Sequence, residues 1–313
     1  SEATLGRSVT YAGLAAGREY TVTQLEVPGM GLSALTCTDG QTSSSARRAV
    51  VVLDPGEQVT CTFTNRPTTF RLVLATSPPT ARDFVFDVCL GNRVCSSVSL
   101  DTDDDPTLSA QAVFGALPGE LVTVTQRRVD GYGLQTISCT DGTGSVPQRL
   151  ATVLMDPGDQ TTCTFTDRPT SLTVLQDTSP SDPVDVGFTG CAGPGGANGC
   201  ASFSLDDDAD ATLNASVTYS ELSDGTVYTL TQHEVAGFAL TNLTCTSGVV
   251  DLANRRVTVV LEAGEQAVCT FVTTRTQVTL TQDSSPHSGQ DFTFAVCGPG
   301  AGGCPTETLD DDD

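Results

Sequence analysis

The chain contains no Lys and no Trp among its 313 residues, and it contains only two His, His233 and His287. All 15 basic residues are Arg, against 38 Asp and Glu, which gives a formal net charge of −23. The phosphates of nucleic acids and anionic membrane surfaces repel so acidic a protein. We therefore expect no nucleic acid as a partner.

Long apolar segments are also missing. No run of about 20 apolar residues is present to span a bilayer, and no basic and then apolar leader opens the sequence at Ser1. We expect no membrane insertion and interpret the chain as a mature protein or a fragment of one. Twelve Cys in an acidic chain rich in Thr, Ser and Gly fit an oxidising compartment. The expected location is secreted or extracellular, at a cell surface.

Internal repetition is what the sequence has in abundance. TVTQLEVPGMGLSALTCTDG from Thr21 returns as TVTQRRVDGYGLQTISCTDG from Thr123 and as TLTQHEVAGFALTNLTCTSG from Thr229. A second block, LDPGEQVTCTFTNRPT in its first copy, repeats at the same offsets of 102 and 106 residues. A fixed period of this kind indicates a tandem array of one structural unit.

Each repeat consists of short β-branched segments. In VTCTF, Val59, Cys61 and Phe63 occupy alternate positions, as in a strand with one buried face. Turn sequences such as LDPGE and DGTG separate the segments, and no helical period is sustained. We predict an all-β fold of tandem prealbumin-like or Ig-like β-sandwiches, with seven or eight strands in each repeat. Because linkers are nearly absent, the repeats should form a rod.

The repeat pattern divides the chain into four parts. Residues 69–170 and 171–275 are predicted to be complete β-sandwich repeats. Residues 1–68 correspond to the C-terminal part of a repeat, and residues 276–313 to the N-terminal part. Joining these two parts restores the acidic loop LDDDADATL that begins at Leu205. We therefore expect residues 276–313 to be completed by residues 1–68 of the next copy.

Two arrangements would achieve this completion. Copies of the chain associate head to tail into a filament, or the 313 residues are one period of a longer covalent array. The array is favoured, because strand exchange normally donates one strand rather than three. Unless covered in this way, apolar side chains of both parts should face water: Val9, Tyr11, Leu35, Phe63, Phe292, Phe294 and Val296.

The FxF…C, LDDDxD, YTVTQ and VTCTF blocks resemble prealbumin-like β-sandwich repeats of secreted bacterial surface and fibre proteins. These repeats are related to the B-type repeats of collagen-adhesin stalks and to pilin backbones. The resemblance extends over essentially all 313 residues and implies a stalk or a fibre. Many such repeats carry a Lys–Asn isopeptide bond promoted by a buried acid. Here Gln24, Gln126 and Gln232 stand at the position of the acid, and the chain has no Lys, so this bond is excluded.

Four Cys per repeat offer a replacement for that cross-link. One pair in each repeat is 24 residues apart at core-facing strand positions, and a second pair closes a short loop. A disulfide restricts the unfolded chain and stabilises a domain by about 2–4 kcal/mol. The predicted disulfides are Cys37–Cys61, Cys89–Cys95, Cys139–Cys163, Cys191–Cys200, Cys245–Cys269 and Cys297–Cys304. The alternative is a four-Cys zinc site, but the sequence lacks CxxC knuckles.

Each repeat also has an acidic loop with carboxylates at alternate positions. Such carboxylates provide the oxygen ligands that calcium prefers, and they repel one another without a counter-ion. The candidate ligands are Asp101, Asp103 and Asp105; Asp206, Asp208 and Asp210; and Asp310, Asp312 and, from the joined part, Glu2. The alternative is a solvated acidic turn that keeps the rod soluble. No cofactor is required, and calcium is the one candidate.

No enzymatic constellation is evident. His233 and His287 lie in different repeats, so a Ser/His/Asp or Cys/His site has no place to form. We predict a non-enzymatic structural shaft of an extracellular filament or surface stalk, whose partners are copies of itself. The alternative is a ligand-binding adhesin, with or without calcium. Five Tyr and no Trp offer little aromatic surface for such a site.

Overall fold

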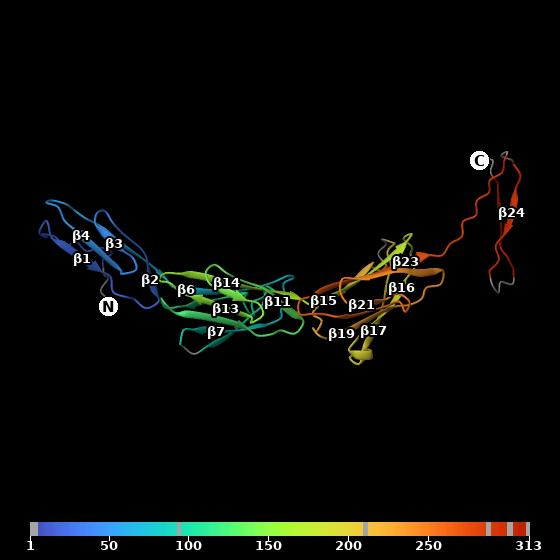
Figure 1. Ribbon diagram of the computed structural model, residues 1–313, viewed down its shortest axis with the longest axis horizontal. Coiled ribbons are helices and arrows are strands. Elements are labelled where there is room, and N and C mark those ends of the chain that lie inside the picture. The colour runs from blue at the N-terminus through green and yellow to red at the C-terminus, as the bar shows by residue number, and fades with distance from the viewer. Residues whose placement is uncertain (1–5, 93–94, 209–211, 286–288, 299–302, 311–313) are drawn as a thin grey trace.

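The structure is a computed structural model that describes residues 6–92, 95–208, 212–285, 289–298 and 303–310. Figure 1 shows an elongated molecule in which β-sandwich modules follow one another along the longest axis. The only helical element of the described residues is the single 3-10 turn η1 (Pro194–Gly196). The expected all-β fold of tandem sandwiches is confirmed.

Residues 69–170 form a sandwich, here called module A. Its strands are β6 (Thr69–Thr76), β7 (Phe84–Leu90), β8 (Ser96–Leu100), β9 (Gln111–Gly115), β10 (Leu121–Gln126), β11 (Tyr132–Cys139), β12 (Thr143–Ser145), β13 (Leu150–Leu154) and β14 (Gln160–Pro169). One sheet has the order β12-β13-β10-β7-β8 and the other β11-β14-β6-β9. Phe84, Phe86 and Phe165 are fully buried between them. Alternate positions of β7 and β14 thus supply the centre of the core.

Residues 171–275 form module B with the same topology. Its strands are β15 (Ser171–Ser179), β16 (Val186–Ala192), β17 (Cys200–Leu205), β18 (Ser216–Tyr219), β19 (Val227–Gln232), β20 (Phe238–Cys245), β21 (Val249–Asp251), β22 (Arg256–Val260) and β23 (Gln266–Arg275). The sheets are β17-β16-β19-β22-β21 and β18-β15-β23-β20. Each module therefore has nine strands, against the seven or eight predicted. The extra strands, β12 and β21, have only three residues each, too few to show an alternating pattern.

The first and last strands of each module lie side by side and run parallel. β6 pairs with β14 from Thr69 opposite Gln160 to Thr76 opposite Asp167. β15 pairs with β23 in the same manner. The last strand of module A continues through Thr170 directly into the first strand of module B. Because the first and last strands run parallel, the chain enters a module at one end and leaves it at the opposite end. Successive modules therefore follow one another along one axis and form a rod (Figure 1).

Residues 6–68 contain only part of this topology. They form the sheets β1-β4-β3 and β2-β5. The strands are β1 (Glu19–Thr23), β2 (Met30–Cys37), β3 (Gln41–Ser43), β4 (Arg48–Val52) and β5 (Cys61–Pro67). Val9 and Tyr11 are each 73% exposed. Leu35, which we expected to face water, is buried, because it forms a small core with Leu32 and Ala49.

Residues 276–310 form a single hairpin in their described part. Its strands are β24 (Phe292–Ala295) and β25 (Thr306–Leu309), paired antiparallel. Figure 1 shows this hairpin at the opposite end of the molecule from β1. Phe292 is 36% exposed and Val296 is 45% exposed. The segment thus presents apolar side chains with no sheet packed against them.

Candidate functional site

The junctions between successive modules are built around one threonine. The Thr68 Oγ1 accepts a hydrogen bond from the Gly158 N–H at 3.0 Å. The Thr68 N–H donates to the Gly29 carbonyl, and its own carbonyl accepts from the Ala116 N–H. Because Gly29 precedes the junction while Gly158 and Ala116 follow it, Thr68 connects the two sides.

Thr170 repeats this arrangement between modules A and B. Its Oγ1 accepts from the Gly264 N–H at 2.8 Å, and its N–H donates to the Gly131 carbonyl. Its carbonyl accepts from the Leu222 N–H at 3.0 Å. Thr68 and Thr170 are each at most 1% exposed. All three polar groups of each threonine are therefore satisfied across a buried junction, which fixes the direction of the next module.

Close backbone contact accompanies each threonine. A Cβ added at Gly31 would lie 1.7 Å from the Gly158 nitrogen. One added at Gly133 would lie 2.1 Å from the Ala263 carbonyl oxygen. Real Cβ atoms do not approach backbone so closely, so these positions require the absence of a side chain. The two glycines allow the loop before the last strand of one module to rest on the preceding module.

Polar side chains reinforce the junction between modules A and B. The Tyr132 hydroxyl donates to Glu221 Oε1 at 3.0 Å, and Arg82 forms an ion pair with the same carboxylate at 3.2 Å. Partial burial raises the pKa of Tyr132. At the same junction, Asp130 accepts from Ser223, and Arg128 pairs with Asp224. These contacts restrict rotation of one module against the other.

A buried polar cluster lies between the sheets of each module at the glutamines singled out in the sequence. In module A, Gln126 Nε2 donates to Asp167 at 2.5 Å, and Arg149 donates to Gln126 Oε1. Burial raises the pKa of Asp167, and the hydrogen bond from Gln126 and the charge of Arg149 oppose this shift. Hydrogen bonds thus hold the Gln126 carboxamide, and Arg149 also forms an ion pair with Asp167 at 3.7 Å.

In module B, the neutral side chains of Thr273 and Gln176 take the place of the buried carboxylate of Asp167. Gln232 Nε2 donates to Thr273 Oγ1 at 3.0 Å and to Gln176 Oε1 at 2.8 Å. Gln176 Nε2 donates to Thr273 Oγ1 at 3.1 Å. Arg255 donates to Gln232 Oε1 at 2.6 Å, as Arg149 does in module A. The sequence pattern singled out the glutamines, but it did not predict their hydrogen-bond partners on the other strands.

The structure joins all six predicted cysteine pairs as disulfides. In each pair that is 24 residues apart, the two Cys face each other on adjacent strands, as Cys139 of β11 faces Cys163 of β14. The remaining three close the hairpin that follows the second strand of a module, as Cys89–Cys95 does between β7 and β8. Each disulfide of modules A and B stays within one sheet, so the two sheets of a sandwich are held together by side-chain packing and by the buried polar cluster rather than by a disulfide.

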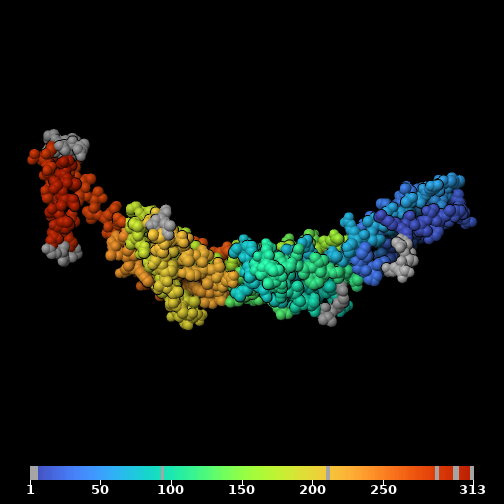
Figure 2. Space-filling model, turned by 180° about the vertical axis from the view of Figure 1, so that it is seen from behind, coloured from blue at the N-terminus to red at the C-terminus, as the bar shows by residue number. Residues whose placement is uncertain are grey.

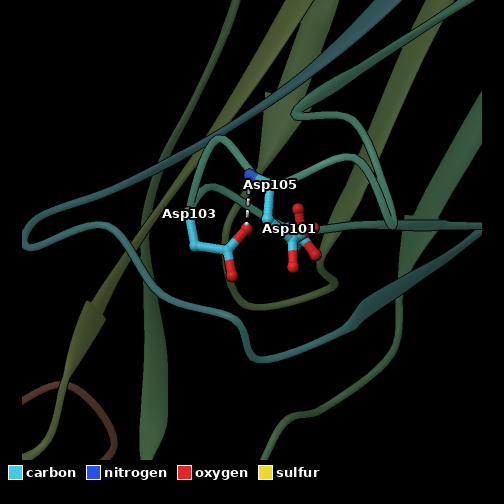
Figure 3. A group of neighbouring side chains, drawn as sticks. All are labelled: Asp101, Asp103 and Asp105. Atoms are coloured by element: carbon cyan, nitrogen blue, oxygen red, sulfur yellow. Dashed lines mark hydrogen bonds between the residues drawn. The ribbon is translucent and has the colours of Figure 1, made fainter.

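The acidic loop of module A brings its three predicted ligands together (Figure 3). One carboxylate oxygen from each of Asp101, Asp103 and Asp105 lies within 4.8 Å of the other two. Asp101 is only 2% exposed, and its burial and the neighbouring carboxylates raise its pKa. A hydrogen bond from Thr107 lowers the pKa of Asp105. Such a group offers oxygen ligands, and Asp101 and Asp105 also line a cleft of about 410 Å³.

The other acidic loops are described only in part. In module B, Asp206 is 2% exposed and accepts from Thr212 at 3.2 Å. Asp208 and Asp310 belong to the described residues, whereas Asp210, Asp312 and Glu2 lie outside them. A convergent group of three acids is therefore described for module A alone, and calcium binding stays a prediction.

The described residues give no assembled catalytic group at the histidine positions. His233 forms a hydrogen bond with the Thr189 hydroxyl at 2.8 Å on an exposed face, and His287 lies outside the described residues. Among the residues that the structure describes, no helix is long and apolar enough to cross a bilayer.

Three solved structures illustrate the similarity to known proteins. A major pilin from Streptococcus pyogenes is 16% identical, with a TM-score of 0.36, and the alignment covers 66% of this chain and 98% of the pilin. A second major pilin from Streptococcus pyogenes is 14% identical, with a TM-score of 0.32 and coverage of 67% and 97%. A bacterial adhesin from Mobiluncus mulieris is 9% identical, with a TM-score of 0.27 and coverage of 66% and 99%. These values are too low to carry an argument.

The family assignment therefore rests on sequence models. A family model described as a prealbumin-like fold domain matches residues 1–67 and 73–169, and a second model of the same description matches residues 189–271. None of the curated proteins compared with the chain matches it. The matched segments include most of modules A and B and all of residues 6–67. The chain belongs to the family of prealbumin-like fold domains.

Proposed function

We propose that the protein is the structural shaft of an extracellular filament or surface stalk and that it performs no catalysis. The observation that carries this proposal is the repeated junction, in which Thr68 and Thr170 make the same three hydrogen bonds. A junction that is buried and repeated produces a stiff array, whereas modules on flexible linkers would point in varied directions. Stiffness over the length of the molecule is what a shaft requires.

The arrangement of the terminal strands also supports a load-bearing role. Tension along the rod pulls β6 at Thr69 and β14 at Pro169 in opposite directions. Because the two strands are parallel, this tension slides one along the other, and the hydrogen bonds of eight paired positions resist it together. Disulfides within the sheets limit how far a module extends once this pair has yielded.

The expected location is the cell surface, and the partner within the shaft is a further copy of the same repeat. Separate chains that associate head to tail and further repeats in a longer chain both provide that partner. The predominance of acidic residues keeps such an array soluble and separate from neighbouring anionic surfaces.

Immunoelectron microscopy of the cells that produce the protein tests the proposal. Antibody raised against modules A and B should label surface fibres at regular intervals along their length. Label confined to fibre tips would favour the adhesin alternative, and label inside the cells would overturn the extracellular role. Small-angle scattering of the purified chain supplies the matching physical test, because a flexible string of modules would contradict a shaft.

A further inference from the structure

Module B contains a pocket of about 380 Å³ that is lined from both of its sheets. One sheet contributes Leu172 of β15 and Tyr219 of β18. The other sheet contributes Gly190 of β16 and Leu230 of β19. Leu222, which follows β18 at the junction with module A, also lines the pocket. The volume falls within the range of about 300–1,000 Å³ that is usual for sites of small ligands.

An aromatic ring occupies the corresponding place in module A. In the β6–β9 pair, Phe70 lies opposite Phe114. In the β15–β18 pair of module B, Leu172 lies opposite Tyr219. The Phe70 ring is fully buried, and its centroid is 6.3 Å from that of the Phe114 ring. Because Leu172 has no ring, Tyr219 lacks the aromatic neighbour that Phe114 has on the adjacent strand.

A glycine at the same place in module B removes a second core side chain. Gly190 lies opposite Leu230, and its counterpart in module A is Val88, which is 1% exposed. A Cβ added at Gly190 would lie 3.4 Å from the Leu230 Cδ2, so the position accepts a side chain without meeting backbone. The nearby Phe203 ring stacks on Phe188 with centroids 5.2 Å apart, and it is not among the residues that line the pocket. It therefore leaves the pocket open.

The loop between β16 and β17 differs from its counterpart beside the same pocket. Cys191 and Cys200 are nine residues apart, whereas Cys89 and Cys95 are six residues apart. The longer loop contains η1, and its Asn198 lines the pocket. Figures 1 and 2 show this loop, in yellow, projecting sideways from the rod. Module B thus differs from module A both in the core positions and in the loop that surround the pocket.

The chemistry of the pocket favours an uncharged ligand with one polar group. All of the residues that line it are uncharged, and its surface is predominantly apolar. The Tyr228 hydroxyl donates to the Ser223 carbonyl at 3.2 Å. Among the described residues, by contrast, no hydrogen-bond partner reaches the Tyr219 hydroxyl. Burial raises the pKa of Tyr219, so this hydroxyl stays protonated and is available to a ligand.

We propose that module B binds a small, uncharged aromatic compound in this pocket. The ring of the ligand takes the place that the Phe70 ring fills in module A. It packs against Tyr219, because aromatic rings favour offset or edge-to-face contact with one another. A donor or acceptor on the ring forms a hydrogen bond with the Tyr219 hydroxyl. The inference goes beyond the shaft role, because a stiff array of modules requires no ligand.

Indole is a suitable probe of this site, because the chain has no Trp and indole fluorescence therefore comes from the ligand alone. Titration of indole with the full chain should shift its emission to shorter wavelength and saturate at one site per chain. Gly190→Val introduces the side chain of Val88 into the pocket, so the affinity should fall by about tenfold or more. Ser202→Val, on the exposed face of β17, is the matched control and should bind indole as the unsubstituted chain does.

Two further variants test the ring and the hydroxyl separately. Leu172→Phe places the ring of module A in the pocket and should also prevent indole binding. Tyr219→Phe keeps the aromatic wall but removes the hydroxyl. It should weaken indole binding by about threefold to tenfold and leave the affinity for toluene, which has no polar group, unchanged. Thermal midpoints show which of the variants are folded.

Three results would overturn the inference. The first is an indole emission that does not saturate with the unsubstituted chain. The second is an equal loss of affinity in Gly190→Val and Ser202→Val, because indole would then bind elsewhere. The third is displacement of indole by cyclohexanol as readily as by phenol, because the pocket would then accept apolar bulk without preference for an aromatic ring.

Discussion

The hydroxyl oxygen of Thr170 accepts a hydrogen bond from the backbone N–H of Gly264, 94 residues further along the chain, at 2.8 Å. Thr170 is fully buried at the point where β14 of module A passes into β15 of module B. This contact ties the loop that precedes the last strand of module B to the residue at which the module begins. Thr68 and Gly158 repeat it at 3.0 Å, so the contact is a property of the repeat.

Replacing Thr170 by Val should destabilise module B. The variant keeps the shape of the side chain but leaves the Gly264 N–H buried without an acceptor, which costs about 1–3 kcal/mol. Native-state hydrogen exchange in peptides from β22 and β23 measures the free energy of opening. Thr244→Val, at an exposed position of β20, is the matched control and should change it by less than about 0.5 kcal/mol. Equal effects of the two variants would contradict the role of the hydroxyl.

Replacing Gly133 by Ala should bend or loosen the rod without unfolding either module. The added methyl group meets the Ala263 carbonyl and the Gly264 nitrogen, which are backbone atoms and cannot rotate away. Small-angle scattering should show a changed maximum dimension or a broader distribution of shapes. Gly115→Ala is the control, because a Cβ there has no neighbour within 4 Å. An unchanged scattering profile for Gly133→Ala would show that the close contact does not set the angle between modules.

The repeats and the alternation of residues such as Val59, Cys61 and Phe63 predict the fold class because each local pattern recurs at a fixed offset. Other features depend on contacts between segments that have no such pattern. The burial of Leu35 depends on Leu32 and Ala49, and a partial core of this size was not expected. Gln126 and Gln232 were singled out because they stand where related repeats carry a buried acid. Their different partners follow from substitutions on other strands.

The junction geometry also could not be predicted from one sequence. In the sequence, nothing distinguishes Gly31 and Gly133 from other glycines in strands. Only the structure shows that the backbone of the loop before the last strand of the next module leaves no room for a side chain there. In the acidic loop, by contrast, the alternate carboxylates can be identified from the sequence. Their convergence depends on the burial of Asp101 at the end of β8, which the spacing alone does not determine.

Substituting Asp101 by Asn should raise the thermal midpoint of module A at neutral pH in the absence of divalent cations. Burial and the charges of Asp103 and Asp105 raise the pKa of Asp101, so the folded state binds its proton more tightly than the unfolded state. The contribution of this group to stability therefore falls as pH rises through the window between its ordinary and its raised pKa. Calorimetry against pH should show this fall in the unsubstituted chain and not in Asp101→Asn.

Calcium should stabilise the unsubstituted chain in the same experiment. A cation bound to the folded loop alone raises the thermal midpoint as its concentration exceeds the dissociation constant. The Asp101→Asn variant should lose this response, while Asp141→Asn, an exposed acid elsewhere in module A, should keep it. A thermal midpoint of the unsubstituted chain that is the same with calcium and with chelator would leave the loop as a solvated acidic turn.

Reduction of the disulfides should lengthen each module when the rod is pulled from its ends. In module A, the Cys139–Cys163 and Cys89–Cys95 bonds close loops of 24 and 6 residues, which tension cannot extend while the bonds are intact. At about 3.5 Å per extended residue, reduction should add about 100 Å to the contour length released on unfolding. Single-molecule force spectroscopy with and without reductant measures this difference. The force at which the module first yields should change little, because the parallel pair of β6 and β14 carries no cross-link between its strands. A contour length that is independent of reductant would show that the cysteines do not limit extension.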